Sequence, residues 1–348
     1  EVIANRVAQL KGEALGSYTY CHPNDHVNKA QSTNDVIPTA GKIATLKLSE
    51  ALIKEVKKAI QEFDRLHIET KHILKVGRTH LQDAVMISMG EVLLGSFGTL
   101  FKRDLKRLET SLEELKTINM GATAVGTGIN THPEYKRHVV EALNQESNDT
   151  FYIADDLIDG TKHIDSFSYV HSTLKTMAVN LSKMSNDFRL MASGPRAGFY
   201  ELYLPEKQPG SSIMPGKVNP VIVEMLNQVS FQVIGNDTTI NMATEAGQME
   251  LNVFEPVLFA NLFESIELLT KGFKHLVNDV LVDLKVNEVR CDDLLEHSLA
   301  HATKLLKVLP YEVVSQVSKK ALSEGKSLRE VLLDDKILSE QEIETLLK

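Results

Sequence analysis

The sequence is poor in several residues that mark particular classes of protein. It has no tryptophan and only two cysteines, Cys21 and Cys291, so a disulfide framework is excluded and a reducing, cytoplasmic environment is expected. Charged residues interrupt every apolar run well before the roughly 20 residues that a membrane span requires, so no membrane segment is predicted. The chain also lacks an initiator methionine and opens within a helical pattern, and we expect further residues upstream.

The overall composition is that of an ordinary globular protein. Of the 348 residues, 43% are hydrophobic and 24% are charged, which excludes disorder and collagen-like repeats. Lys and Arg together number 38 against 47 Asp and Glu, a net charge of −9. Because phosphate binding depends on clustered Lys and Arg, this balance argues against nucleic acid as a partner. A small anionic substrate stays open, since a pocket can be locally positive on an acidic surface.

Apolar residues recur at steps of three and four over unusually long stretches. One series runs from Phe97 to Leu115, and a second runs from Phe167 to Met191. This spacing predicts one apolar stripe per helix, with the helices packed at shallow angles. The five long helices that we predict lie at 38–75, 84–117, 164–193, 220–243 and 256–284.

The pattern changes to short helices after residue 284. Ser327 with Glu330, and Ser339 with Glu342, have the spacing of capping boxes at helix starts. We therefore predict an all-α fold, with a central long-helix bundle that carries the active-site loops over residues 1–284 and a small C-terminal helical domain over 285–348. A bundle with this much apolar surface is expected to need partner subunits.

The segment 210–220, GSSIMPGKVNP, combines residues that suit an anion-binding loop. Its two glycines allow it to move and close over a ligand. Asn219 and Pro220 suit the cap and first position of a helix, so Ser211, Lys217 and a helix start share one loop. Free backbone N–H groups and an ammonium together favour an anion. The alternative is an ordinary connector with a solvent-facing lysine.

Polar residues also gather at two other predicted links between helices. One link carries Thr79 and His80, and the other carries Ser32, Thr33 and Asn34. Small hydroxyl and amide side chains at helix ends are usually caps, and a lone histidine is more often structural than catalytic. A role in chemistry depends on whether these groups meet, which periodicity does not show.

Residue types that bind metals cluster twice, as Cys21, His22, Asp25 and His26, and as His67, Glu69 and His72. The first group needs a further partner to make a zinc site, and the second lacks the spacing that places two histidines on one helical face. We predict no metal and no organic cofactor.

The segment 210–220 closely resembles the signature of the fumarase/aspartase superfamily. The resemblance extends over nearly the whole chain, through NDHVNKAQSTND at 24–35, GRTHLQDA at 77–84, GTGINTHPEY at 126–135 and SGPRAG at 193–198. Within the superfamily, residues 227–253 resemble the aspartate ammonia-lyase branch more than the fumarate hydratase branch. The segment THPEY is shared with class II fumarases.

The resemblance implies a homotetramer whose long helices form a common bundle, with each active site built from three subunits. The reaction that it implies is a reversible anti elimination on a small dicarboxylate. In the aspartate ammonia-lyase branch, L-aspartate gives fumarate and ammonia through an aci-carboxylate intermediate.

Carried over residue by residue, the resemblance also implies catalytic roles. Ser211, as its oxyanion, would be the general base, and Lys217 and Asn219 would hold the carboxylate on which charge develops. Glu224 would pair with His80 and orient it. The residues implied to line the rest of the substrate pocket are Ser32, Thr33, Asn34, Thr79, His80 and Ser212. A serine hydroxyl is a poor base in water, so loop amides or a positive field must favour its ionised form.

Some positions depart from the superfamily pattern. Met86, Glu91 and Val223 stand where Pro, Gln and Pro are expected, and the chain begins after the place of a further substrate motif. Two alternatives therefore stay open. One is a class II fumarate hydratase, which has the same fold and base but acts on L-malate, and the other is a non-catalytic helical-bundle paralogue.

Overall fold

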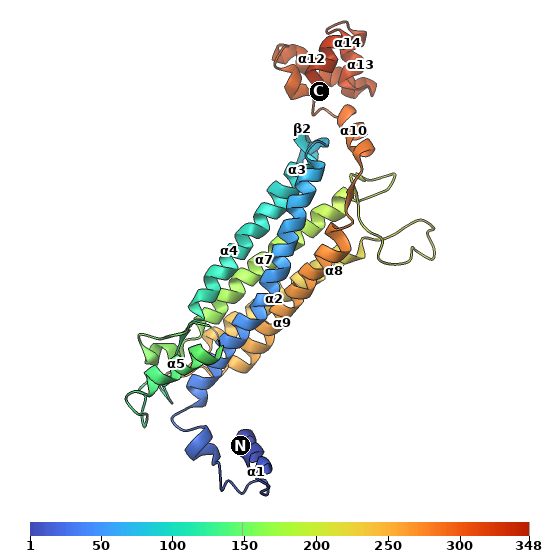
Figure 1. Ribbon diagram of the computed structural model, residues 1–348. Helices are drawn as coiled ribbons and strands as arrows, with labels where there is room; N and C mark the ends of the chain where they lie inside the picture. The colour runs from blue at the N-terminus through green and yellow to red at the C-terminus, as the bar shows by residue number, and fades with distance from the viewer. Residues whose placement is uncertain (148, 348) are drawn as a thin grey trace. The chain divides into compact units, whose positions relative to one another are not determined.

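The computed structural model describes residues 1–147 and 149–347, most of which are helical (Figure 1). The α-helices are α1 (Val2–Leu10), α2 (Thr33–Thr70), α3 (Met89–Glu91), α4 (Thr99–Glu114), α5 (Tyr135–Ser147), α6 (Leu157–Lys162), α7 (Asp165–Met191), α8 (Val221–Glu245), α9 (Glu255–Leu276), α10 (Glu288–Glu296), α11 (Ala302–Leu305), α12 (Tyr311–Glu324), α13 (Leu328–Asp334) and α14 (Glu340–Leu347). Three π-helical segments are η1 (Pro23–Val27), η2 (Val92–Gly98) and η3 (Val277–Leu281). The predicted all-α, long-helix fold is confirmed.

The strands are few and short. They are β1 (Leu74–Thr79), β2 (Gln82–Ser88), β3 (Thr117–Ile118), β4 (Tyr152–Ile153), β5 (Leu202–Tyr203) and β6 (Lys285–Val286). The pairs β1–β2 and β5–β6 are antiparallel, and β3–β4 is parallel. None of the described helices is long and apolar enough to cross a membrane.

The chain divides into two compact units. Unit 1 comprises Glu1–Ile53, Leu105–Ala178 and Phe231–Leu269, and unit 2 comprises Lys54–Asp104, Val179–Ser230 and Thr270–Lys348. Each of the five helices α2, α4, α7, α8 and α9 contributes a segment to both units. This division differs from the predicted one into 1–284 and 285–348, which stays a prediction.

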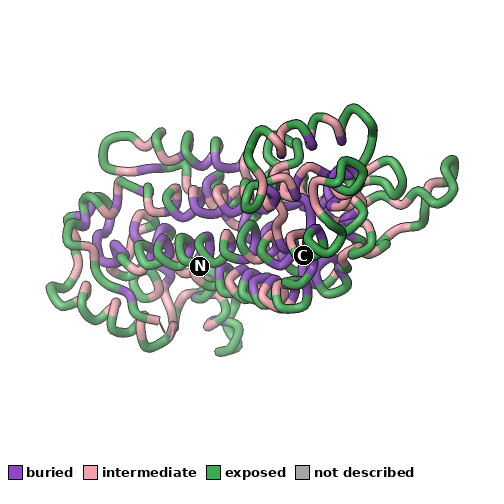
Figure 2. Tube along the Cα trace, turned by 90° about the horizontal axis from the view of Figure 1, so that it is seen from above, coloured by how far each residue is buried: buried purple, intermediate pink, exposed green. Residues whose placement is uncertain are grey.

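Aromatic rings fill the core of unit 2. Phe63 stacks on Phe101 with ring centroids 5.9 Å apart, and the edge of Phe101 meets Phe273 at 5.2 Å. Phe97 packs against Phe63 and, at 5.2 Å, against Phe188. All five side chains are fully buried, and they bring together α2, η2, α4, α7 and α9. Figure 2 shows the resulting alternation of buried and exposed residues along the helices.

The core of unit 1 relies on a small residue opposite a large one. Phe167 of α7 meets Phe259 of α9 edge to face at 5.1 Å. A Cβ added to Gly41 of α2 would lie 2.2 Å from the Phe259 ring, so a larger residue there would require the ring to move. The missing side chain lets α2 and α9 approach closely.

Helix α2 begins earlier than predicted, at Thr33 instead of residue 38. The Ser32 hydroxyl accepts from Asn34 N at 3.2 Å, while Ser32 N donates to the Asp35 carboxylate at 2.9 Å. The two bonds resemble a capping box with Asp35 in the acidic position, but the Ser32 hydroxyl accepts from the second helical residue instead of the third. Pro38 is tolerated because the carbonyl that it leaves free, on Asn34, accepts from the Asn119 side chain at 3.0 Å.

The prediction of helix at 71–75 and 84–88 is wrong, as is the prediction of a simple link at 76–84. Helix α2 ends at Thr70, and β1 and β2 form a hairpin instead. Val76, Leu74 and Met86 pack with Leu294 and Leu295 of α10. Side chains that alternate along a strand fit this surface, and such distant packing overrides local helix propensity.

The C-terminal helices have an apolar core of their own. Its buried members, all between Leu305 and Ile343, come from α11, α12, α13 and α14. The predicted capping box of Ser327 and Glu330 is present, and Ser339 and Glu342 exchange the same bonds. The small C-terminal set of helices is therefore as predicted.

Candidate active site

The loop before α8 is closed by its own backbone. Ser211 N donates to Lys217 O at 2.9 Å, and Lys217 N donates to Met214 O at 3.1 Å. Gly216 has φ +80, in the left-handed region where glycine carries no steric cost. The tip of the loop faces outward, with Ile213 86% exposed. The loop is thus locally shaped without being packed into the core.

Within this loop, backbone amides point at the Ser211 hydroxyl. Its Oγ accepts from Ile213 N at 3.3 Å and from Met214 N at 3.1 Å. Two N–H donors stabilise negative charge on an oxygen more than they stabilise the neutral hydroxyl. Amides in this arrangement would favour the ionised form of the Ser211 hydroxyl. Ser212, next along the loop, is exposed.

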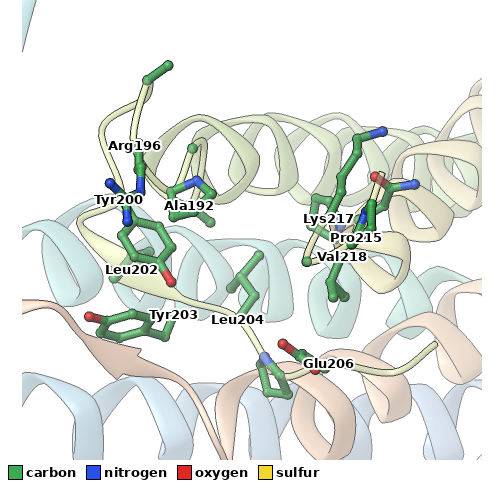
Figure 3. Close-up of a pocket in the computed structure, with 17 residues that line it drawn as sticks. Ala192, Arg196, Tyr200, Leu202, Tyr203, Leu204, Glu206, Pro215, Lys217 and Val218 are labelled. Atoms are coloured by element: carbon green, nitrogen blue, oxygen red, sulfur yellow. The ribbon is translucent and has the colours of Figure 1, made fainter. Parts of the chain in front are cut away.

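Lys217 and Asn219 line a pocket of about 670 Å³ in unit 2. Figure 3 shows Tyr200 and Tyr203 on one side of this pocket and Lys217 on the other, with Leu204 between them. Among the described residues, no carboxylate forms an ion pair with the Lys217 ammonium. This cation is therefore available to a bound anion.

The start of α8 differs slightly from the prediction. The helix begins at Val221, so Pro220 precedes the first helical residue instead of occupying it. Glu224, one turn in, lies 3.8 Å from Arg189 of α7. Over the described part of a single chain, no hydrogen bond or ion pair joins Glu224 to His80. Their pairing stays a prediction for an assembly.

Thr79 and His80 stand at the exposed tip of the β1–β2 hairpin. Thr79 pairs with Gln82, so His80 and Leu81 form a two-residue turn with φ of +54 and +60. Positive φ at both central positions is the type I′ geometry, which usually selects Asn-Gly. Each side chain held there costs about 1–3 kcal/mol and persists only where the surroundings enforce it. Such strain is typical of functional sites.

A β-bulge changes the direction of strand β1 just before this turn. The register shifts between Val76, which pairs with Met86, and Arg78, which pairs with Asp83. A Cβ on Gly77 would lie 2.7 Å from the Val85 carbonyl oxygen, so the bulge requires glycine. Bulges of this kind often direct side chains beside active sites. Thr79 lines a second pocket of unit 2, of about 410 Å³.

Ser32, Thr33 and Asn34 belong to unit 1, whereas the other predicted site residues belong to unit 2. The Asn34 side chain donates to Ala124 O at 2.7 Å. The buried carboxylate of Asp35 accepts from Gly121 N and Thr123 N, at 3.2 and 3.0 Å, as well as from Ser32 N. Asp35 therefore fixes the Ser32 turn against the glycine- and threonine-rich segment.

Comparison with known proteins identifies the family. The family model described as Lyase matches residues 1–235. The chain is 46% identical over 347 residues to the aspartate ammonia-lyase of Bacillus subtilis (strain 168), with 100% of this chain and 73% of that protein covered. It is 43% identical over 344 residues to the aspartate ammonia-lyase of Escherichia coli (strain K12), with 99% and 72% covered.

The chain belongs to the fumarase/aspartase superfamily of lyases.

Solved structures of superfamily proteins have the same fold. Fumarate lyase:delta crystallin from Brucella melitensis, bound to cobalt, superimposes with a TM-score of 0.96 at 39% identity, over 99% of this chain and 75% of that one. A class II fumarase from Schistosoma mansoni superimposes with a TM-score of 0.91 at 31% identity, over 100% and 76%.

The sequence analysis did not identify a buried cluster of charged side chains next to the β1–β2 hairpin. Glu201 lies 2.8 Å from Arg78 Nη1 and 3.2 Å from Lys75 Nζ, and its own side chain is 0% exposed. Burial lowers the pKa of Lys75, and the Glu201 carboxylate opposes that shift. Cys291 is buried nearby, where burial and then the Glu201 charge raise the pKa of its thiol to about 12. Glu201 is far from Arg78 in sequence, so no local pattern could reveal the pairing.

Among the residues of metal-binding types, His22 has a local structural role. The Nδ1 atom of His22 accepts from Asn24 N and Asp25 N, and so caps η1. Across residues 1–147 and 149–347, no group of three or more His, Cys, Asp or Glu side chains is arranged to hold a metal ion.

Proposed function

We propose that this superfamily member is a carbon–nitrogen lyase that converts L-aspartate reversibly to fumarate and ammonia. The observation that carries the proposal is the 40–47% identity to proteins named aspartate ammonia-lyase, over essentially the whole of this chain. The family model matches residues 1–235, so the Ser211 loop and the Thr79–His80 hairpin both lie within the matched region.

In the proposed mechanism, the ionised Ser211 hydroxyl takes a proton from the carbon next to one substrate carboxylate. The electrons of that C–H bond pass onto the carboxylate, which becomes an aci-carboxylate with a second negative charge. Lys217 and Asn219 would hold this group, because fixed donors stabilise a transition state most where charge develops. The electrons then form the carbon–carbon double bond as the C–N bond breaks and ammonia leaves.

The geometry of the Ser211 loop supports this role for the serine. Ser211 Oγ already accepts two backbone N–H groups, and no ion pair joins Lys217 to a carboxylate among the residues described. Closure of the loop over substrate would exclude water and strengthen both interactions. His80, held in a strained turn, would act on the same substrate together with Thr79 and Ser212, and with the Ser32–Asn34 turn.

We also propose that the enzyme is a homotetramer with active sites shared between three subunits. The part of α8 in unit 1 has an exposed face without a charged side chain from Phe231 to Met242, which are 60% and 63% exposed. A long uncharged, partly apolar helix face is typical of a surface that a second copy covers. Within one chain this face of α8 is exposed, and a second copy would bury it in the assembly. The cytoplasmic location stays a prediction.

The second candidate function is hydration of fumarate, favoured by the structural likeness to class II fumarase. Fumarate formation from L-aspartate and from L-malate, followed by ultraviolet absorbance on the purified enzyme, separates the two. The proposal expects a higher kcat/KM for L-aspartate. A preference for L-malate would reverse the assignment, and absence of turnover with both would favour the non-catalytic alternative.

A further inference from the structure

The buried cluster of Lys75, Arg78 and Glu201 places a single carboxylate between two cations. The Glu201 Oε1 atom accepts from Arg78 Nη1 at 2.8 Å, and Oε2 lies 3.2 Å from Lys75 Nζ. The Lys75 and Arg78 side chains are only 6% and 12% exposed. Oε2 makes no hydrogen bond in the described structure, so the charge of Lys75 is its main partner. Glu201 is therefore the only carboxylate in ion-pair contact with either cation among the residues described.

Glu201 itself is anchored by backbone hydrogen bonds to residues outside the hairpin. Its backbone N–H donates to Met191 O at 2.8 Å, at the end of α7, and its carbonyl accepts from Asn287 N at 2.9 Å, at the start of α10. Arg290 of α10 holds the preceding segment through the carbonyls of Phe199 and Gly198. These contacts hold Glu201 against α7 and α10, so its carboxylate can fix the position of the hairpin.

Arg78 connects the Glu201 carboxylate to the strained turn. Its guanidinium lies 4.2 Å from the centroid of the Phe199 ring and donates to Glu201, which leaves it little freedom. Thr79 and His80 follow directly along the chain, at positions where the backbone must keep φ positive at His80 and Leu81. Such a conformation needs enforcement from outside the turn. The buried ion pair of Arg78 is a contact of that kind immediately beside it.

We infer that Glu201 is a positioning residue, which acts through Arg78 and Lys75 to hold the Thr79–His80 turn in its strained, substrate-facing conformation. The inference rests on the proposed function for the role of His80. A glutamine at position 201 would keep the size of the side chain but leave two buried cations without a carboxylate. Because a buried unpaired charge is strongly unfavourable, the hairpin would relax away from the cluster.

The first test uses Glu201→Gln and does not depend on activity. Hydrogen exchange of the backbone amides should rise in residues 74–88 and stay unchanged in the helices of unit 1. The matched control is Asp237→Asn, which removes another buried carboxylate, paired with His171 at 2.9 Å and Lys175 at 2.6 Å in unit 1. It should leave exchange in 74–88 unchanged. Unchanged exchange at 74–88 in Glu201→Gln, or equal increases in both variants, would overturn the inference.

The second test asks whether Glu201 acts through His80, by a double-mutant cycle with His80→Asn. In the enzyme that keeps His80, Glu201→Gln should lower kcat/KM for L-aspartate by about 10- to 100-fold, because a small misplacement of a catalytic group has effects of this size. In the His80→Asn background the further loss should be below about 3-fold, since coupled residues are not additive. Fully multiplicative losses would show a general structural role and contradict the inference.

A second variant covers the case in which Glu201→Gln does not fold. Arg78→Lys keeps the charge but removes the planar group that stacks on Phe199, and it should give the same exchange pattern and the same non-additivity. If the wild-type enzyme turns over neither L-aspartate nor L-malate, the proposed function fails. The exchange experiment still decides whether Glu201 holds the turn.

Discussion

The two segments of unit 2 that carry the proposed chemistry are held in opposite ways. The Ser211 loop is shaped by its own backbone: two amides point at Ser211 Oγ, Gly216 turns the chain, and the tip is exposed. The β1–β2 hairpin is held from beneath by buried charges and by packing against α10. A loop that must close over substrate benefits from few outside contacts, whereas a turn that must keep a strained histidine needs many.

The largest effect is expected at the loop. Ser211→Ala should lower kcat for the elimination by about 10²–10⁴-fold, because it removes the proposed general base. Steady-state rates of fumarate formation measure the loss. Ser323→Ala, an exposed serine of α12, is the matched control and should behave as wild type. Turnover by Ser211→Ala within about threefold of wild type would remove the serine from this role.

The buried side of the hairpin, near Cys291, should be inaccessible to thiol reagents, whereas the Ser211 loop is exposed. The pKa of Cys291 is raised to about 12 by burial, so the folded protein holds this thiol protonated and it becomes a thiolate only as the pH approaches that value. At pH 8 its alkylation should be about 10²–10³-fold slower than that of an exposed thiol. Mass spectrometry after timed alkylation should find Cys21, which is partly exposed, modified first. Equal alkylation rates for Cys291 and Cys21 would mean that the charged cluster next to the hairpin is accessible to solvent.

Backbone crowding should matter more in the hairpin than in the loop. Gly77→Ala places a Cβ against the Val85 carbonyl oxygen, and we expect a loss of about 1–3 kcal/mol of stability, seen as a lower Tm. His80 would move with the bulge, so kcat/KM should fall as well. An unchanged Tm would argue that the bulge is not held tightly.

The smallest effect on stability is expected for Gly216→Ala. The site has open space, so only the positive φ opposes the side chain, at about 1 kcal/mol. Gly325→Ala at the end of α12 has the same backbone cost and is the matched control. Both should lower Tm equally, but only Gly216→Ala should lower kcat. Equal activity in the two would contradict a requirement for this loop conformation.

The same contrast explains what could be predicted from the sequence. The apolar stripes through Phe101 and Phe188 identified the long helices, because helical periodicity is local. The Ser211 loop could be identified for the same reason, since the residues that shape it lie within it. The hairpin could not be predicted in this way, because Val76 and Met86 pack against α10, which is far away in the sequence. Glu201 could not either, because its partner Arg78 lies 123 residues away in sequence.

We propose that the Ser211 loop and the hairpin act in one active site, with the two segments drawn from different subunits. This arrangement can be tested by mixing Ser211→Ala and His80→Asn chains, each of which we expect to be nearly inactive alone, and by unfolding and refolding them together. If the two residues of a site come from different chains, about one quarter of the sites in random mixed tetramers have both wild-type residues, and activity returns in that proportion. If activity stays at the sum of the two separate variants, the site is not shared in this way and the claim is contradicted.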